Sequence, residues 1–300
     1  MTLSSPPRQV SMLRAWVLAA RPPTLPAAVV PVLVGTASAA RQGTFHLLPA
    51  LVALLGALLI QIGTNLANDY FDFQHGADTA ERLGPVRVTQ SGLLAPSTVL
   101  GATIGVFAAA AICGLYLTSV AGLPILLIGI LSILAGVLYT GGPWPLAYHG
   151  LGDLFVFIFF GLIAVMGSIY VQRQAIATGD AIVALPVALL VTAILVVNNL
   201  RDIDTDRRAR KYTLAVLLGR RFARIEYATC LIGAYLLLPG SWLARLLPLG
   251  ALLPILTMPL AVLLLRAAAA GEGRSLNATL AGTGRLHMLF GLLLALGLLL

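Results

Sequence analysis

The sequence predicts an all-α membrane protein, a polytopic bundle of about nine transmembrane helices, on three observations. Of its 300 residues, 59% are hydrophobic and only 10% are charged. The mean hydropathy is +0.96. The apolar residues form nine separate stretches, most of them close to the roughly 20 residues that a helix needs to cross a bilayer. Because so few polar side chains cannot cover a water-soluble globule of this size, a soluble enzyme is excluded.

The nine stretches account for nearly the whole chain, so we expect one integral-membrane domain over residues 1–300. The first stretch contains Pro26 and Pro31, and the last has only 15 residues, about 22 Å of helix. Residues 1–20 lack the features of a signal peptide, and Arg14 and Arg21 flank an apolar segment around Trp16, so we expect an interfacial helix there. The stretches are 24–40, 47–68, 97–118, 122–140, 152–174, 180–200, 225–242, 246–266 and 286–300.

The basic residues are distributed unequally between the two sides that nine alternating spans define. Of the 19 lysines and arginines, 16 fall on one side and only Arg41, Arg173 and Arg245 on the other. Positive charge collects in cytoplasmic loops, so the N-terminus is predicted to be cytoplasmic and the protein to lie in the plasma (inner) membrane. This distribution also explains the net charge of +8 without any nucleic-acid partner.

Six of the eight aspartates lie in two short clusters, each directly after an apolar stretch. The first reads Asn65-Leu-Ala-Asn68-Asp69-Tyr-Phe-Asp72 and continues to Asp78. The second reads Asn198-Asn199-Leu-Arg-Asp202-Ile-Asp-Thr-Asp206. If the spans continue as helix, Asn68 and Asp72 share one face, and so do Asn198, Asp202 and Asp206. Asp204 faces elsewhere, and Asp78 joins the first face only if the helix ends near Gly76.

Carboxylates gathered at a membrane boundary repel one another and resist desolvation, so a cation is expected to offset their charge. Oxygen ligands of this kind suit Mg²⁺, which bridges carboxylates to phosphate oxygens. The predicted metal ligands are Asp69, Asp72, Asp78, Asp202 and Asp206. The alternative is a solvated loop whose acids neutralise nearby arginines.

Basic residues follow each cluster and are candidates for binding the phosphate groups of a ligand. Arg82 and Arg87 follow the first cluster, and Lys211, the only lysine in the chain, follows the second. Guanidinium and ammonium groups bind phosphate oxygens through charge-assisted hydrogen bonds. The alternative is that these charges serve only membrane topology.

At these residues the sequence resembles the UbiA superfamily of membrane prenyltransferases, which carries two aspartate-rich motifs at cytoplasmic helix ends. The resemblance covers about 20 to 300 and is strongest to the branch that acts on 1,4-dihydroxy-2-naphthoate in menaquinone biosynthesis. Four segments carry it in order: Arg21-Pro-Pro-Thr24-Leu-Pro26, Arg82-Leu-Gly-Pro-Val-Arg87-Val-Thr-Gln90-Ser-Gly92, Tyr139-Thr-Gly-Gly-Pro143 with Gly150-Leu-Gly152, and Asn198 to Asp202 running into Lys211-Tyr-Thr213.

The resemblance implies the reaction and the roles of the residues. A polyprenyl diphosphate would bind with its head on Mg²⁺ between the two motifs and its tail in a groove facing the lipid bilayer. Its allylic cation would then be captured by the naphthoate ring, which loses its carboxylate to give demethylmenaquinone. Asp72, Asp202 and Tyr139 are the predicted catalytic residues, the last through its ring face. Asn68, Arg82, Arg87, Asn199 and Lys211 are the predicted diphosphate-binding residues.

The sequence departs from the family at Gly76, where the first motif commonly has a further aspartate; Asp78 stands in for it by a longer turn. Two alternatives remain. One is a family member that acts on 4-hydroxybenzoate or homogentisate. The other is a cation-coupled transporter, although transporter sites usually lie near the bilayer midplane on broken helices rather than at helix ends.

Overall fold

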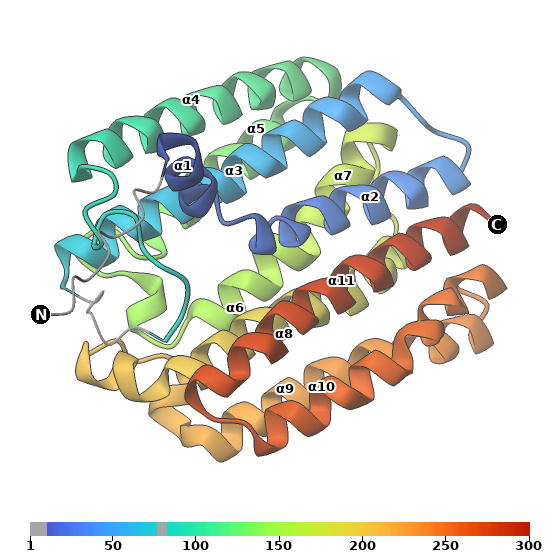
Figure 1. Ribbon diagram of the computed structural model, residues 1–300. Coiled ribbons are helices and arrows are strands. Elements are labelled where there is room, and N and C mark those ends of the chain that lie inside the picture. The colour runs from blue at the N-terminus through green and yellow to red at the C-terminus, as the bar shows by residue number, and fades with distance from the viewer. Residues whose placement is uncertain (1–10, 77–82) are drawn as a thin grey trace, which may run out of the picture.

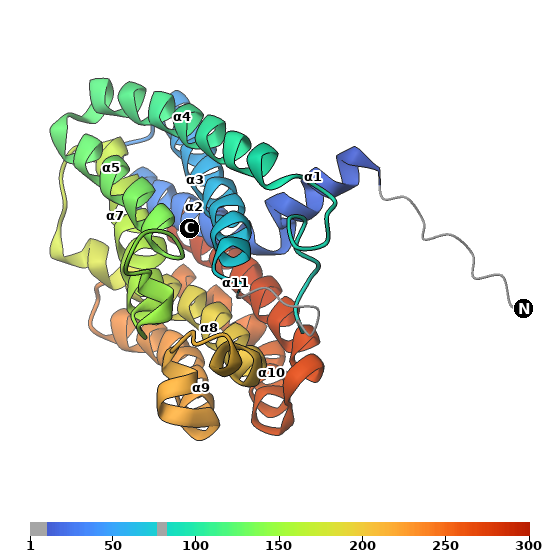
Figure 2. The same ribbon diagram turned by 90° about the vertical axis from the view of Figure 1, so that its left-hand side faces the viewer.

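A computed structural model describes residues 11–76 and 83–300, and these fold into helices without any strand. The helices pack side by side into one elongated bundle (Figures 1 and 2). In chain order they are α1 (Met12–Ala20), η1 (Pro22–Thr24), α2 (Pro26–Arg41), α3 (Leu47–Gln74), α4 (Pro96–Ala121), α5 (Leu123–Leu138), η2 (Leu146–Tyr148), α6 (Gly152–Val156), η3 (Phe157–Ile163), α7 (Ala164–Arg173), α8 (Thr178–Arg208), α9 (Leu214–Leu243), η4 (Leu249–Thr257), α10 (Met258–Ala270), η5 (Gly273–Ser275) and α11 (Leu276–Leu299).

The membrane spans follow the predicted order. Within the described residues, seven helical stretches are long and apolar enough to cross a membrane, and a bent pair formed by Met12–Thr24 and Pro26–Arg41 makes an eighth. The remaining predicted stretch is α5, an apolar helix of 16 residues, or about 24 Å. The all-α, multi-span prediction is therefore confirmed, with about nine apolar helical segments.

Four helices extend beyond the predicted spans. Helix α9 begins at Leu214, eleven residues before the predicted start at 225. Helix α11 has 24 residues and begins at Leu276, ten residues before the predicted start at 286. The polar residues in this extension do not interrupt the helix, because Thr283 donates its hydroxyl to the Thr279 carbonyl one turn earlier. Helices α3 and α8 likewise continue past 68 and 200 to Gln74 and Arg208, so that both acidic clusters begin inside helices.

Helix α8 lies at the centre of the bundle. Two-thirds (67%) of its most apolar window is buried, against 28% for α3 and for α4. An apolar helix that is buried on all sides belongs to a core, whereas the outer faces of α3 and α4 are left for lipid. Packing against α8 is close: a Cβ atom on Gly161 would lie 2.2 Å from Cβ of Ala188. Small residues thus allow helix backbones to approach, as is usual in membrane bundles.

The chain bends sharply before α2, where the prolines cluster. The two parts of the bent pair meet at 51°, because Pro26 has no N–H group to continue a helix from the preceding turn. Thr24 fixes this bend by accepting hydrogen bonds from Gln61 (3.0 Å) and Asn65 (2.9 Å) on α3. Pro31, by contrast, lies within α2 without ending it.

Helix α1 packs across the outside of α3. Its Ala15 and Ala19 are buried with Leu66 of α3, whereas Met12 and Leu13 are exposed. In Figure 1 this short dark-blue helix lies across the longer ones instead of joining their bundle. The interfacial placement of this segment stays a prediction, and residues 1–10 lie outside the described part of the chain.

Candidate active site

The two acidic clusters lie at the same end of the bundle, where α3 and α8 end (the left end in Figure 1). Because α3 runs to Gln74 and α8 to Arg208, the one-turn spacing expected for Asn68 and Asp72, and for Asn198, Asp202 and Asp206, is present. Helix α3 also stops where the sequence required: Gly76 has a φ of +65°, beyond the C-cap at His75. Asp78 and Arg82 lie outside the described residues.

Asp72 is the buried centre of the first cluster, with 2% of its surface exposed. Its Oδ2 accepts a hydrogen bond from Nη2 of Arg87 at 2.7 Å, and its Oδ1 accepts one from the Tyr148 hydroxyl at 2.9 Å. Nζ of Lys211 lies 5.4 Å from the centre of the Tyr148 ring. The lysine that follows the second cluster therefore reaches the first cluster through Tyr148.

Asp69, one turn before Asp72 on α3, holds the loop formed by residues 83–95. Its carboxylate oxygens accept hydrogen bonds from the backbone N–H groups of Val88 (3.2 Å) and Thr89 (2.9 Å). Both oxygens are thus used to place the segment that carries Arg87. The assignment of Asp69 as a metal ligand stays a prediction, and in this structure its side chain binds the backbone of the loop.

Asp202 is the buried centre of the second cluster and is paired with its neighbour Arg201. Nε of Arg201 lies 2.8 Å from Oδ1 of Asp202, and Nη2 lies 2.5 Å from Oδ2. Arg201 is buried too, although the topological argument counted it among the loop charges. Asp204 points outward to Arg220, as expected, and Asp206 is partly exposed. The aspartates at the two centres are therefore buried ion pairs rather than acids of a solvated loop.

The other predicted residues lie around Tyr139, at the C-terminal end of α5. Asn68 accepts a hydrogen bond from Thr140, the residue after Tyr139, at 2.8 Å. Asn199 points to Asp153, with Nδ2 and Oδ1 3.5 Å apart. Tyr139 itself lies within electrostatic reach of Asp72, Asp153 and Asp206. The tyrosine is thus close to acids of both clusters.

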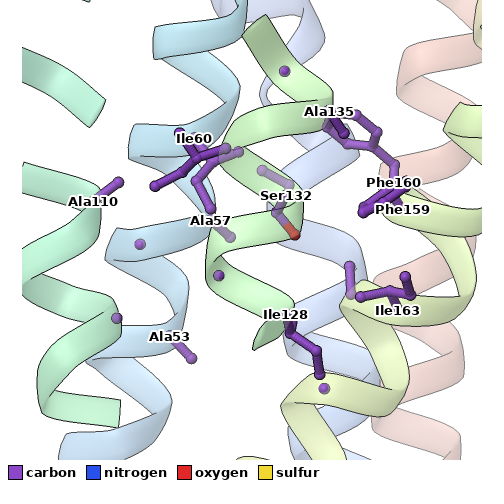
Figure 3. A pocket seen from close by; sticks show the side chains of 18 of the residues that line it. Ala53, Ala57, Ile60, Ala110, Ile128, Ser132, Ala135, Phe159, Phe160 and Ile163 are labelled. Carbon is purple, nitrogen blue, oxygen red and sulfur yellow. The ribbon is translucent and has the colours of Figure 1, made fainter. Parts of the chain in front are cut away.

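An apolar cavity of about 300 Å³ extends from Tyr139 into the membrane-spanning part of the bundle. Its walls come from α2, α3, α4, α5, α6, η3 and α7, and only Thr64, Ser132, Ser168 and Tyr139 are polar among the residues that line it. Figure 3 shows Ala57, Ile60, Ile128 and Phe159 facing this space, with the Ser132 hydroxyl as the only oxygen among the labelled side chains. A chain of hydrocarbon fits such a surface.

The wall that carries Phe159 and Phe160 is irregular. Residues Phe157–Ile163 form a π-helical turn between α6 and α7. Such turns shift the direction of the side chains that follow, and they are frequent at functional sites. Here Phe159, Phe160 and Ile163 all line the cavity.

The residues present suit a divalent cation bound together with a ligand. Among residues 11–76 and 83–300, no three His, Cys, Asp or Glu side chains gather into one group. Mg²⁺ does not require such a group, because it takes one or two carboxylates, several waters and phosphate oxygens. Asp72 and Asp202, one from each cluster, are the carboxylates that would hold such a cation. Their chemistry therefore fits Mg²⁺ shared with a diphosphate.

Sequence reasoning missed four residues of this end of the bundle: Tyr148, Asp153, Arg201 and Asn277. Asp153 directly follows the quoted Gly150-Leu-Gly152 segment, and Arg201 lies inside the second cluster, so position gave a signal for these two. No signal in the sequence pointed to Tyr148 or Asn277, because each makes a hydrogen bond to a residue far away in the chain. Tyr148 donates to Asp72, and Asn277 donates to the Leu83 carbonyl.

Comparison with known proteins agrees with this geometry. The sequence pattern of the UbiA prenyltransferase family matches residues 28–299. The chain is 41% identical, over 85% of each sequence, to 1,4-dihydroxy-2-naphthoate octaprenyltransferase of Escherichia coli, and 34% identical to that of Bacillus subtilis over 98% of this chain and 94% of the relative. Its fold resembles that of a UbiA homologue from Archaeoglobus fulgidus bound to GPP and Mg²⁺, with a TM-score of 0.66 and 15% identity, covering 95% of this chain and 99% of the other. The chain therefore belongs to the UbiA prenyltransferase family.

Proposed function

We propose that this protein transfers a polyprenyl group from a polyprenyl diphosphate to 1,4-dihydroxy-2-naphthoate, in a reaction that requires Mg²⁺. The ring carboxylate is lost as CO₂, and the balanced product is demethylmenaquinol, the reduced (quinol) form of demethylmenaquinone. The observation that carries the proposal is an apolar cavity of about 300 Å³ that meets the charged end of the bundle at Tyr139. The acceptor is taken from the relatives that are 34 to 41% identical and bear that activity in their names.

The donor binds across the boundary between these two environments. Its isoprenoid tail occupies the cavity, where each buried CH₂ group contributes about 0.8 kcal/mol. Its diphosphate lies among Asn68, Arg82, Arg87, Asn199 and Lys211. The aspartates of the two clusters would hold Mg²⁺, which would neutralise charge on the diphosphate; the candidates are Asp69, Asp72, Asp78, Asp202 and Asp206.

The reaction then proceeds by loss of diphosphate from the allylic carbon. The C–O bond of the donor breaks and its electron pair leaves with the diphosphate, whose growing negative charge is stabilised by Arg87 and Lys211. The allylic cation lies against the ring face of Tyr139. A C–C bond forms from the electron-rich naphthoate ring, and departure of CO₂ returns an electron pair to that ring. The apolar walls keep water away from the cation.

The protein is a multi-pass membrane protein, and we assign it to the plasma membrane with its N-terminus and its active site in the cytoplasm. The assignment rests on the 16 of 19 basic residues that fall on the side of the two acidic clusters. At the opposite end of the bundle Arg173 pairs with Asp180, which lowers the net positive charge there.

The test is turnover by purified protein in detergent. It is incubated with Mg²⁺, polyprenyl diphosphates of several lengths, and 1,4-dihydroxy-2-naphthoate, 4-hydroxybenzoate or homogentisate, and products are identified by mass. We expect prenylated, decarboxylated naphthoate, abolished by EDTA and by Asp72→Asn. If only 4-hydroxybenzoate or only homogentisate gave a product, that acid would be the acceptor instead of 1,4-dihydroxy-2-naphthoate. Absence of turnover with every acid would reject the enzyme assignment, and turnover without a membrane gradient would exclude a coupled transporter.

A further inference from the structure

We propose that Arg201 is a positioning residue: together with Asn277 it fixes the 83–95 loop, and with it Arg87, at the mouth of the active site. This inference rests on the proposed function, in which Arg87 binds the diphosphate of the donor. It assigns a task to a buried arginine that neither the metal ligands nor the phosphate-binding residues account for.

Arg201 is almost fully buried, with 1% of its surface exposed, and its guanidinium contacts more than one partner. Besides its bidentate pair with Asp202, it donates from Nη2 to Oδ1 of Asn198 at 2.9 Å and from Nη1 to Oδ1 of Asn277 at 3.1 Å. The five donors of a guanidinium allow this, whereas neutralising Asp202 requires only two of them. The remaining nitrogen, Nη1, is thus directed away from Asp202 and toward α11.

The 83–95 loop lies directly against this guanidinium. A Cβ atom added to Gly84 would lie 2.8 Å from Nη2 and 3.1 Å from Cζ of Arg201. Backbone can approach a buried side chain this closely only where the residue has no side chain of its own. Gly84 is therefore packed on Arg201, not merely near it.

Asn277 completes the link. Its Nδ2 donates to the Leu83 carbonyl at 3.0 Å, while its Oδ1 accepts from Arg201. One amide at the start of α11 thus connects the guanidinium on α8 to the backbone of the loop. Asn277 belongs to neither acidic cluster. Its substitution therefore tests the connection between Arg201 and the loop without altering a carboxylate.

Arg87 lies between this anchor and a second one. On one side Leu83 and Gly84 are held by Asn277 and Arg201. On the other, Val88 and Thr89 are held by Asp69 of α3. Only Pro85 and Val86 separate Arg87 from the first anchor. Loss of that anchor frees the chain on one side of Arg87 and leaves the Asp69 contacts in place.

The experiment compares the wild type with Asn277→Ala, Arg201→Ala, Arg201→Lys and the control Arg220→Ala. Arg220 lies at the same end of the bundle and pairs with exposed Asp204, so the control removes a charge without touching the loop. One measurement is hydrogen exchange of the backbone amides of residues 83–95 in detergent. The other is the affinity for inorganic diphosphate with Mg²⁺, determined by calorimetry, which needs neither acceptor nor turnover.

We expect Asn277→Ala to accelerate exchange in the 83–95 loop and to weaken diphosphate binding about tenfold, as the loss of hydrogen bonds to a charged and a backbone group implies. Arg201→Ala has a larger effect on both measurements. Arg201→Lys has a smaller effect than Arg201→Ala because lysine keeps the charge, but it does not match the wild type because lysine lacks the planar guanidinium. Arg220→Ala leaves both measurements unchanged. In turnover assays, KM for the prenyl donor rises in Asn277→Ala while KM for the acceptor stays.

Unchanged amide exchange of the 83–95 loop in Asn277→Ala and Arg201→Ala would refute the proposal that these two residues fix the loop. Faster exchange with unaltered diphosphate affinity would refute its role in placing Arg87. Failure of the wild type to turn over any aromatic acid, with diphosphate binding intact and sensitive to Asn277→Ala, would reject the proposed function and leave the positioning role standing.

Discussion

Replacing Arg87 by Ala is the most informative single change, because Arg87 links the loop to the first acidic cluster. Its side chain is 5% exposed and that of Asp72 is 3% exposed, with 2.7 Å between Nη2 and Oδ2. A pair so far removed from water differs from a surface salt bridge, which contributes about 0–1 kcal/mol. A charge-assisted hydrogen bond is worth about 1.5–3 kcal/mol. If Arg87 contacts the diphosphate, kcat/KM for the prenyl donor should fall roughly ten- to a hundredfold in Arg87→Ala.

The assay measures kcat/KM for donor and for acceptor separately, alongside the thermal stability of each variant. Arg87→Lys should fall between wild type and Arg87→Ala, since a lysine keeps the charge and loses the bidentate fork. Arg220→Ala, from an exposed pair, should stay within about fivefold of wild type.

Arg87→Ala also leaves a buried carboxylate without its cation, which costs about 3–5 kcal/mol. The double variant Asp72→Asn, Arg87→Ala removes that charge as well. It should recover stability without recovering activity, which separates folding from catalysis. An Arg87→Ala enzyme with unaltered donor kinetics would refute the role of this residue. An effect confined to the acceptor would instead assign Arg87 to the ring carboxylate.

Further outcomes are expected from the same geometry. Asp72→Asn and Asp202→Asn should each abolish turnover while the protein remains folded; near-normal rates at saturating Mg²⁺, measured by product mass, would contradict a site shared between the clusters. Lys211→Ala should lower kcat/KM for the donor about tenfold or more, and equal rates for wild type and variant would return Lys211 to a topological role. Ser132→Phe, which fills the cavity, should shift the preferred donor toward shorter isoprenoids, and an unchanged chain-length profile would mean that the tail lies elsewhere. Cysteines that replace Ala80 and Ala209 should react with an impermeant thiol reagent only after the membrane is opened. Labelling of both in intact cells would mean that the orientation is opposite to the one proposed.

Much of the fold is predictable because lipid imposes a strong local signal. A spanning segment must be long and apolar and must satisfy its own backbone hydrogen bonds, so each of the nine stretches coincides with helix. The predicted ends were less accurate at α3, α8 and α11. There the helices extend beyond the apolar residues, because polar side chains such as Asp72, Arg201 and Thr283 are buried within the protein instead of entering water.

The position of the candidate site was proposed from the sequence, since aspartates concentrated at helix ends are costly unless they have a function. Their partners were not. Tyr148 contacts Asp72 across 76 positions of sequence, and Asn277 contacts Leu83 across 194. Asp69 looked equivalent to Asp72 in the sequence, yet Asp69 accepts hydrogen bonds from the backbone of the loop, whereas Asp72 pairs with the side chain of Arg87.

Hydrophobicity and charge act locally and leave a pattern along the chain, so the sequence alone indicates a protein that crosses the membrane many times as helices and gathers acids and bases at one end. The pairing of Arg87 with Asp72, the contacts of Arg201 with Asp202 and the loop, and the apolar cavity beside Tyr139 become visible only in the folded protein. Those features depend on which helix faces pack together. Packing brings distant residues into contact, and the sequence around each of them contains no signal of its partner.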